Sequence, residues 1–156
     1  MHQNAELIER FYQAFAQRDA ATMRAAYHPA ARFDDPAFPG LEGAEIGDMW
    51  EMLVTRGKDL EVTFEGVEAD DDKGRAHWDA WYTFSGTGRK VHNSIDAAFE
   101  FRDGKIYRHR DVFSFWRWSR QALGLPGLLL GWTPLLAAKV QKTARKNLAA
   151  WRARPR

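Results

Sequence analysis

Ionisable side chains alternate along two segments of the chain in a pattern that could build an acid/base site. His92, Ser94 and Asp96 are spaced two residues apart in the first segment, and His109 and Asp111 have the same spacing in the second. Successive side chains of a strand point to opposite faces, so each set would share one face. If the two sets face one interior, imidazole and carboxyl groups converge there, as proton transfer requires. The alternative is that His92, Ser94 and Asp96 lie on a wet outer face, which is the default in antiparallel sheets.

A loop supplies two more carboxylates. The stretch "FDDPAFPGLEG", residues 33–43, places Asp34 directly before Asp35 and follows them with Pro36 and Pro39. Proline rings restrict the backbone, so the carboxylates precede a stiffened segment. By composition alone this is either a solvated turn or a loop that aims one aspartate at a ligand.

The elements that must position these residues change period along the chain. Apolar residues recur every three or four positions at first, which predicts helices, and later alternate, which predicts strands. The expected helices span residues 4–17, 19–29 and 43–57, with a short strand over 31–35, and the expected later strands span 60–69, 75–85, 90–101 and 105–116. Helices followed by hairpin-linked strands indicate the α+β class, with an antiparallel sheet that bends over the helices.

Composition bounds the class of protein. The chain has 156 residues, 45% of them hydrophobic, a formal net charge of +2 and no cysteine. This predicts one domain without disulfides or thiolate metal sites, in a reducing compartment such as the cytoplasm. The first residues carry charges through their apolar pattern and do not resemble a signal peptide, and no stretch approaches the roughly 20 apolar residues of a membrane span.

The C-terminal part differs in charge from the rest. From Arg117 onward there are nine Lys and Arg residues and no Asp or Glu. The segment "GLPGLLLGWTPLL" is apolar and broken by Gly and Pro, and a basic helix is expected over residues 134–152. Such a tail could touch nucleic acid or an anionic membrane. We expect instead a solvated helix face or a contact with a partner subunit, and no nucleic-acid binding.

Motifs for metals and cofactors are weak or absent. His109 and Asp111 with His92 could ligate a metal, but they come from separate strands without a helical His pair. Glycine-rich nucleotide loops and the G-x-S-x-G elbow do not occur. We therefore expect neither metal nor cofactor.

With these elements assigned, the chain resembles the SnoaL-like branch of the nuclear-transport-factor-2-like superfamily, which includes ketosteroid isomerase and limonene epoxide hydrolase. The resemblance rests on "FDDPAFPGLEG", the "RDGKI" hairpin and the closing "HRDVF" strand. It implies a cone-shaped fold over residues 1–118, with residues 119–156 as a C-terminal extension rather than a second domain. The apolar part of this extension could rest on a membrane, but we expect it instead to cap the mouth of the cone or to pack on a partner subunit.

The isomerase suggests roles for two aspartates. Its general base precedes a proline in a similar loop, which matches Asp35, so Asp34 would face solvent. Its oxyanion-hole acid directly follows an isoleucine and lies eight residues before the glycine of the closing hairpin. Asp96 matches this position, because it follows Ile95 and precedes Gly104 by eight residues. The resemblance thus implies that Asp96 points into the cavity, beside His109 and Asp111, and not onto the outer face of the sheet.

The sequence also departs from its relatives. Phe11 stands where the isomerase has its oxyanion-hole tyrosine, and Tyr12 is rotated away from it by about 100°. The Arg-x-Asp pair of the epoxide hydrolase is absent, although Asp111 resembles its closing-strand aspartate. SnoaL-like cyclases use a closing-strand acid with a nearby histidine, a role open to Asp111 with His92 or His109.

The resemblance implies a protein with a small-molecule pocket, and two functions remain open. The first is cofactor-free acid/base catalysis (isomerisation, cyclisation or dehydration) on a hydrophobic carbonyl compound, with Asp35, Asp96, His109 and Asp111 as the catalytic groups. The second is a non-catalytic ligand-binding or dimerisation module. A homodimer is expected in either case. The expected lining consists of Phe11, Phe15, Phe38, Trp50, Trp78, Tyr82, His92 and Phe113.

Overall fold

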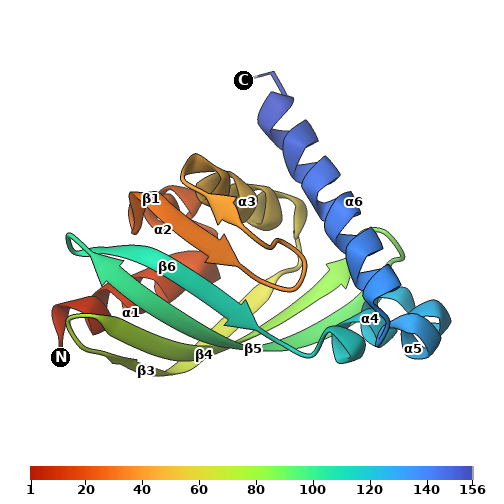
Figure 1. Cartoon of the computed structure of the whole chain (residues 1–156), viewed down its shortest axis with the longest axis horizontal. Coiled ribbons are helices and arrows are strands. Elements are labelled where there is room, and N and C mark those ends of the chain that lie inside the picture. Colours follow the sequence, from red (N-terminus) through yellow and green to blue (C-terminus); the bar gives the residue numbers. More distant parts are fainter. Residues whose placement is uncertain (156) are drawn as a thin grey trace.

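A six-stranded curved sheet forms the body of the molecule in the computed structural model, which describes residues 1–155 (Figure 1). The strands are β1 (Tyr27–Asp34), β2 (Leu41–Glu42), β3 (Glu61–Ala69), β4 (Lys73–Phe84), β5 (Arg89–Arg102) and β6 (Lys105–Val112). They lie in the order β2-β1-β6-β5-β4-β3. The helices are α1 (Gln3–Ala16), α2 (Ala20–Ala25), α3 (Ala44–Arg56), α4 (Phe115–Leu123), α5 (Leu125–Leu130) and α6 (Pro134–Ala153).

The N-terminal helices cover the concave face of the sheet (Figure 1). The apolar spacing of α1 buries Ile8, Phe11 and Phe15, and α3 adds Met49 and Trp50 to the same core. Burial of large apolar side chains on one helical stripe is what holds a short amphipathic helix against a sheet. The α+β architecture predicted from the sequence is confirmed.

The pairing of β4 with β5 sorts the side chains by face. Trp78 lies opposite Ile95 and His77 lies opposite Asp96. Trp78 and Ile95 are buried on the inner face, whereas Asp96 is exposed on the outer face. This register decides the face on which His92 and Asp96 of β5 lie.

Three details differ from the sequence-based expectation. The sheet is mixed rather than antiparallel, because β1 pairs with β6 in parallel. The second helix ends at Ala25, and Tyr27 begins β1 instead of closing that helix. Pro29, expected to terminate the helix, falls where the β1–β6 register shifts, so its missing N–H costs no regular ladder bond. The last strand stops at Val112, and the Ser114 side chain caps α4.

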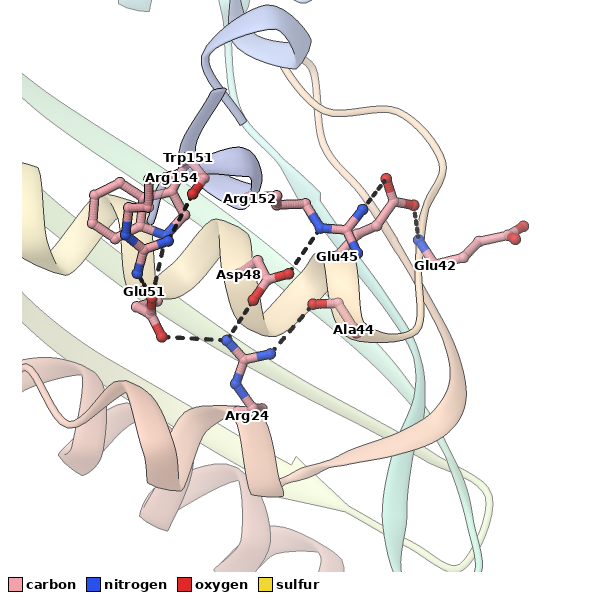
Figure 2. A network of polar contacts seen from close by, with 9 residues as sticks. All are labelled: Arg24, Glu42, Ala44, Glu45, Asp48, Glu51, Trp151, Arg152 and Arg154. Atoms are coloured by element: carbon pink, nitrogen blue, oxygen red, sulfur yellow. Dashed lines mark hydrogen bonds and ion pairs between the residues drawn. The ribbon is translucent and has the colours of Figure 1, made fainter. Parts of the chain in front are cut away.

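Helix α6 runs back across the molecule and is anchored to α3 at its C-terminal end (Figure 2). Asp48 of α3 accepts from Arg24 at 2.7 Å and from Arg152 at 2.8 Å. Glu51 pairs with Arg154 and accepts from the Trp151 indole at 3.2 Å. These contacts hold the C-terminal end of α6 against α3.

Candidate functional site

A cavity of about 590 Å³ lies between the inner face of the sheet, α3 and the C-terminal helices. Its lining is mostly aromatic and aliphatic, with a few polar side chains that include Asp35, Tyr82, Asn93 and Asp111. A mainly apolar pocket with a few convergent polar groups is typical of a site for a small hydrophobic molecule.

Asp111 is a deeply buried polar residue in the wall of this cavity. Its side chain is only 2% exposed, and its two oxygens have different surroundings. Oδ1 accepts from His109 Nε2 at 2.8 Å and from Trp78 Nε1 at a longer 3.4 Å. Oδ2 is buried and has no hydrogen-bond partner among residues 1–155. An unsatisfied buried oxygen is costly, so Oδ2 is available to accept a hydrogen bond from a molecule in the cavity.

A chain of buried hydrogen bonds leads to Asp111. Trp50 Nε1 donates to the Tyr27 hydroxyl at 3.0 Å, and that hydroxyl lies 2.7 Å from His109 Nδ1. An ionised carboxylate can only accept, so His109 Nε2 donates to Asp111, and in the neutral imidazole Nδ1 accepts from the Tyr27 hydroxyl. The His109 proton then sits on Nε2 and points at Asp111, an assignment made from the network. These hydrogen bonds fix the position of one Asp111 oxygen and leave the other turned away from them.

Asp34 and Asp35, although adjacent, have opposite electrostatic environments. Asp34 accepts from the Arg32 guanidinium at 2.9 Å and from the Gly40 amide at 2.8 Å. The hydrogen bond from Arg32 is the main cause that lowers the pKa of Asp34. Asp35 lines the cavity, where burial raises its pKa to about 7 and the nearby charge of Asp111 adds to the effect.

The loop holds one oxygen of Asp35 by hydrogen bonds to its own backbone. Oδ1 accepts from the backbone amides of Ala37 at 2.7 Å and of Phe38 at 2.6 Å, as in a side-chain turn. Oδ2 makes no such contact within residues 1–155. With a pKa near 7, Asp35 populates both protonation states at neutral pH, as a general acid requires.

Tyrosine hydroxyls supply two further polar groups inside the molecule. Tyr82 lines the cavity, and its hydroxyl accepts from Trp118 Nε1 at 2.7 Å. Burial raises the pKa of Tyr82 to about 12, so the phenol stays protonated. The Tyr12 hydroxyl is buried without a partner among residues 1–155. Burial first, and the charge of Asp111 second, hold its pKa well above the ordinary value.

Many of the residues singled out from the sequence meet in this cavity. Asp35 and Asp111 lie in its wall, and His109 lies directly behind Asp111. Six of the aromatic residues expected to line the pocket do so: Phe15, Phe38, Trp50, Trp78, Tyr82 and Phe113.

The other predicted residues lie elsewhere. Asp96 was assigned to the oxyanion hole from the resemblance, but its side chain is 82% exposed and accepts from His77 at 2.8 Å on the outer face. His92 also lies outside, stacked on Trp81 at 4.5 Å. Both assignments were wrong because the β4–β5 register turns these residues outward, as simple alternation had suggested. Phe11 is fully buried in the core and does not line the cavity.

The sequence analysis missed Tyr27 and the α6 side of the cavity. Tyr27 was assigned to a helix, and its contact with His109 depends on the parallel β1–β6 pairing, which no local signal reveals. The α6 residues could have been found, because Leu136, Val140 and Ala144 recur every four positions and line the cavity.

The family model for a SnoaL-like domain matches residues 8–109, and the chain belongs to this family. The match ends at His109 and does not include Asp111 or the C-terminal helices. No curated protein matches the chain at a significant level.

Solved structures show the same fold at low sequence identity. An LEH-like epoxide hydrolase from M. tuberculosis is 21% identical, with a TM-score of 0.66 and coverage of 82% of this chain and 96% of its own. A proposed SnoaL-like polyketide cyclase from Jannaschia sp. CCS1 is 19% identical, with a TM-score of 0.66 and coverage of 80% and 93%. IdmH, a proposed polyketide cyclase from Streptomyces antibioticus, is 22% identical, with a TM-score of 0.63 and coverage of 80% and 100%. These likenesses establish the nuclear-transport-factor-2-like fold.

Proposed function

We propose that the chain is an acid/base enzyme that moves a proton at the carbon next to a carbonyl group of a hydrophobic compound, in a cyclisation of the aldol type. The observation that carries this proposal is the Asp111 carboxylate. It lies in an apolar cavity with one oxygen held by His109 and Trp78 and the other without a partner. A carboxylate held in this way is a positioned general base.

Each step can be written with the groups of the cavity. Asp111 Oδ2 takes the proton from the α-carbon, and the resulting enolate carbon bonds to a second carbonyl carbon of the same substrate. The oxygen of that second carbonyl gains negative charge and takes a proton from Asp35, which is half protonated near pH 7. The two aspartates then exchange the proton through solvent, which restores the starting state.

The family supports this chemistry, and the residues distinguish it from other activities of the fold. Two of the similar structures are proposed polyketide cyclases. The ketosteroid isomerase arrangement is not supported, because Phe11 replaces its tyrosine and Asp96 lies on the outer face. The His109–Asp111 pair instead resembles the histidine and closing-strand acid of the SnoaL-like cyclases.

The experiment has two stages. A panel of hydrophobic ketones and 1,3-diketones, with 2-tetralone as the simplest, is screened for compounds that raise the melting temperature of the protein. Uptake of deuterium from heavy water at the α-carbon of each binder is then followed by NMR. Enzyme-dependent exchange supports the proposal. If compounds bind but exchange no faster than in buffer, the protein is a binding module and the catalytic proposal fails.

A further inference from the structure

The short helix α5 and the residues after it carry large apolar side chains that face solvent. These are Leu125, Leu128, Leu129, Leu130, Trp132 and Leu135, which we call the apolar tip. Trp132 is 75% exposed and Leu135 is 83% exposed. The tip lies at one end of the molecule, beside α4 and the start of α6 (Figure 1). Soluble monomers seldom expose such a concentration of apolar side chains, and those that do use it for binding.

The apolar tip is built into the fold rather than attached loosely to it. Trp116 of α4 donates to the Leu128 carbonyl at 3.1 Å. Gly127 approaches α4 so closely that a Cβ atom there would lie 1.9 Å from the Ser119 carbonyl oxygen. The Ser119 side chain also fits against Gly131, where a Cβ atom would lie 2.0 Å from its hydroxyl. This close packing fixes the outward direction of the leucines.

A stripe of positive charge continues from the tip along α6. Leu135, Lys139, Lys142 and Lys146 are spaced by four, three and four residues, which places them on one face of the helix. All four are exposed, and no ion pair involves these lysines within residues 1–155. The sequence contains no Asp or Glu after Asp111, so nothing in this segment offsets the charge. A surface of exposed leucine and tryptophan beside lysines is complementary to an anionic lipid bilayer.

The same segment borders the cavity. Pro126 lies in the cavity wall next to the exposed Leu125, and Leu136 lies in the wall next to the exposed Leu135. Lys139 lines the cavity as well and belongs to the charged stripe. A surface on which the tip rests would therefore face the rim of the cavity, where an apolar compound enters or leaves.

We propose that the apolar tip and the lysine stripe of α6 dock this protein on the surface of an anionic lipid bilayer. The leucines and Trp132 would insert at the level of the headgroups, while Lys139 and Lys142 would contact lipid phosphates. Within residues 1–155 no helix is both long and apolar enough to cross a membrane, so the contact is with its surface. If the protein has the proposed function, an apolar substrate would pass from the bilayer into the cavity. The docking itself does not depend on that function.

The test measures sedimentation of the full chain with vesicles of equal parts phosphatidylglycerol and phosphatidylcholine, against vesicles of phosphatidylcholine alone. We expect binding to the anionic vesicles that weakens as salt is added. Lys139→Gln with Lys142→Gln should lower the partition coefficient about thirtyfold. Leu128→Gln with Leu129→Gln should lower it by at least tenfold. The positions are exposed, so the variants are expected to fold, and circular dichroism checks this.

A matched control removes the same charge elsewhere. Arg10 and Lys73 are exposed on α1 and at the start of β4, and Arg10→Gln with Lys73→Gln should leave vesicle binding within about twofold of the unaltered chain. Absence of vesicle binding, or an equal loss in control and test variants, overturns the proposal. It is also overturned if the chain is a dimer that the leucine variants convert to monomers, because a second copy would then cover the tip. Each of these readouts is independent of catalysis, so failure here leaves the proposed function standing.

Discussion

The two faces of the sheet carry histidine–aspartate pairs that are joined at the same distance in very different surroundings. On the inner face, His109 and Asp111 are joined at 2.8 Å and are 0% and 2% exposed. On the outer face, His77 and Asp96 are also joined at 2.8 Å, but their side chains are 32% and 82% exposed. The inner pair faces an apolar cavity, whereas water screens the outer pair.

This difference shows that residue type alone does not place a histidine–aspartate pair beside the cavity. Both pairs come from strands of the same sheet, and each has the residue types that an acid/base site requires. Burial strengthens the electrostatic interactions of the inner pair and leaves one carboxylate oxygen for a ligand. The comparison predicts that equivalent substitutions on the two faces will have unequal effects.

The largest difference is expected in catalysis. Asp111→Asn removes the proposed base and should lower the rate of α-proton exchange by about 10²–10⁴-fold, whereas the matched Asp96→Asn should leave it unchanged. NMR detection of deuterium uptake by a bound ketone measures both variants. Equal rates in the two variants would contradict the assignment of the site to the inner face.

The next largest effect concerns how stability depends on pH. The pKa of Asp35 is about 7 in the folded chain against an ordinary 3.8, so the folded state binds the proton more tightly. The free energy of unfolding should therefore fall as pH rises from about 4 to 7, by at most about 1.4 kcal/mol for each unit of pKa difference. Urea denaturation across this range measures the slope, and Asp35→Asn should remove it.

The adjacent residue provides a control of opposite sign. Arg32 lowers the pKa of Asp34, so this carboxylate stabilises the fold above its ordinary pKa and loses that contribution as pH falls. Asp34→Asn should leave the falling slope between pH 4 and 7 in place. If Asp34→Asn removes that slope and Asp35→Asn does not, the inward orientation assigned to Asp35 is wrong.

A smaller effect is expected from the tyrosines of the two faces. Tyr27→Phe leaves the buried Trp50 N–H and His109 Nδ1 without a partner and should lower the free energy of unfolding by about 1–3 kcal/mol. Tyr107 lies on the outside of β6 against the Arg102 guanidinium, so Tyr107→Phe keeps that packing and should have an effect near zero. Chemical denaturation measures both variants. Equal losses would mean that the buried hydrogen bonds of Tyr27 add nothing to the free energy of unfolding.

The smallest effect is expected for the outer pair. Asp96→Asn removes the carboxylate charge that faces His77 in a solvent-accessible pair and should change the free energy of unfolding by less than about 1 kcal/mol. Urea denaturation at neutral pH checks this value. A loss as large as that of Tyr27→Phe would show that the pair of His77 and Asp96 stabilises the fold despite its exposure to water.

The sequence predicted more of the fold than of the site. Periodicity was sufficient for α1, α3 and strands β3 to β5, because apolar spacing reports which side of an element is buried, but it missed β2 and the start of β1. Asp35 and Asp111, both singled out from the sequence, line the cavity, and His109 is hydrogen-bonded to Asp111, while their catalytic roles stay predictions.

The failures have identifiable physical causes. Asp96 was turned inward by analogy with a relative, although alternation with Ile95 already predicted an outward position. Tyr27 reaches His109 only through a parallel pairing between strands distant in sequence, which local propensity does not encode. The homodimer and the cytoplasmic location stay predictions.

A crystal structure of the protein with a bound ketone from the panel tests the central claim most directly. The account predicts that the ligand occupies the cavity beneath α6, with a carbonyl oxygen within hydrogen-bond distance of Asp35 and its α-carbon beside Oδ2 of Asp111. A ligand that contacts neither carboxylate, or that binds on the outer face near His77 and Asp96, would contradict it.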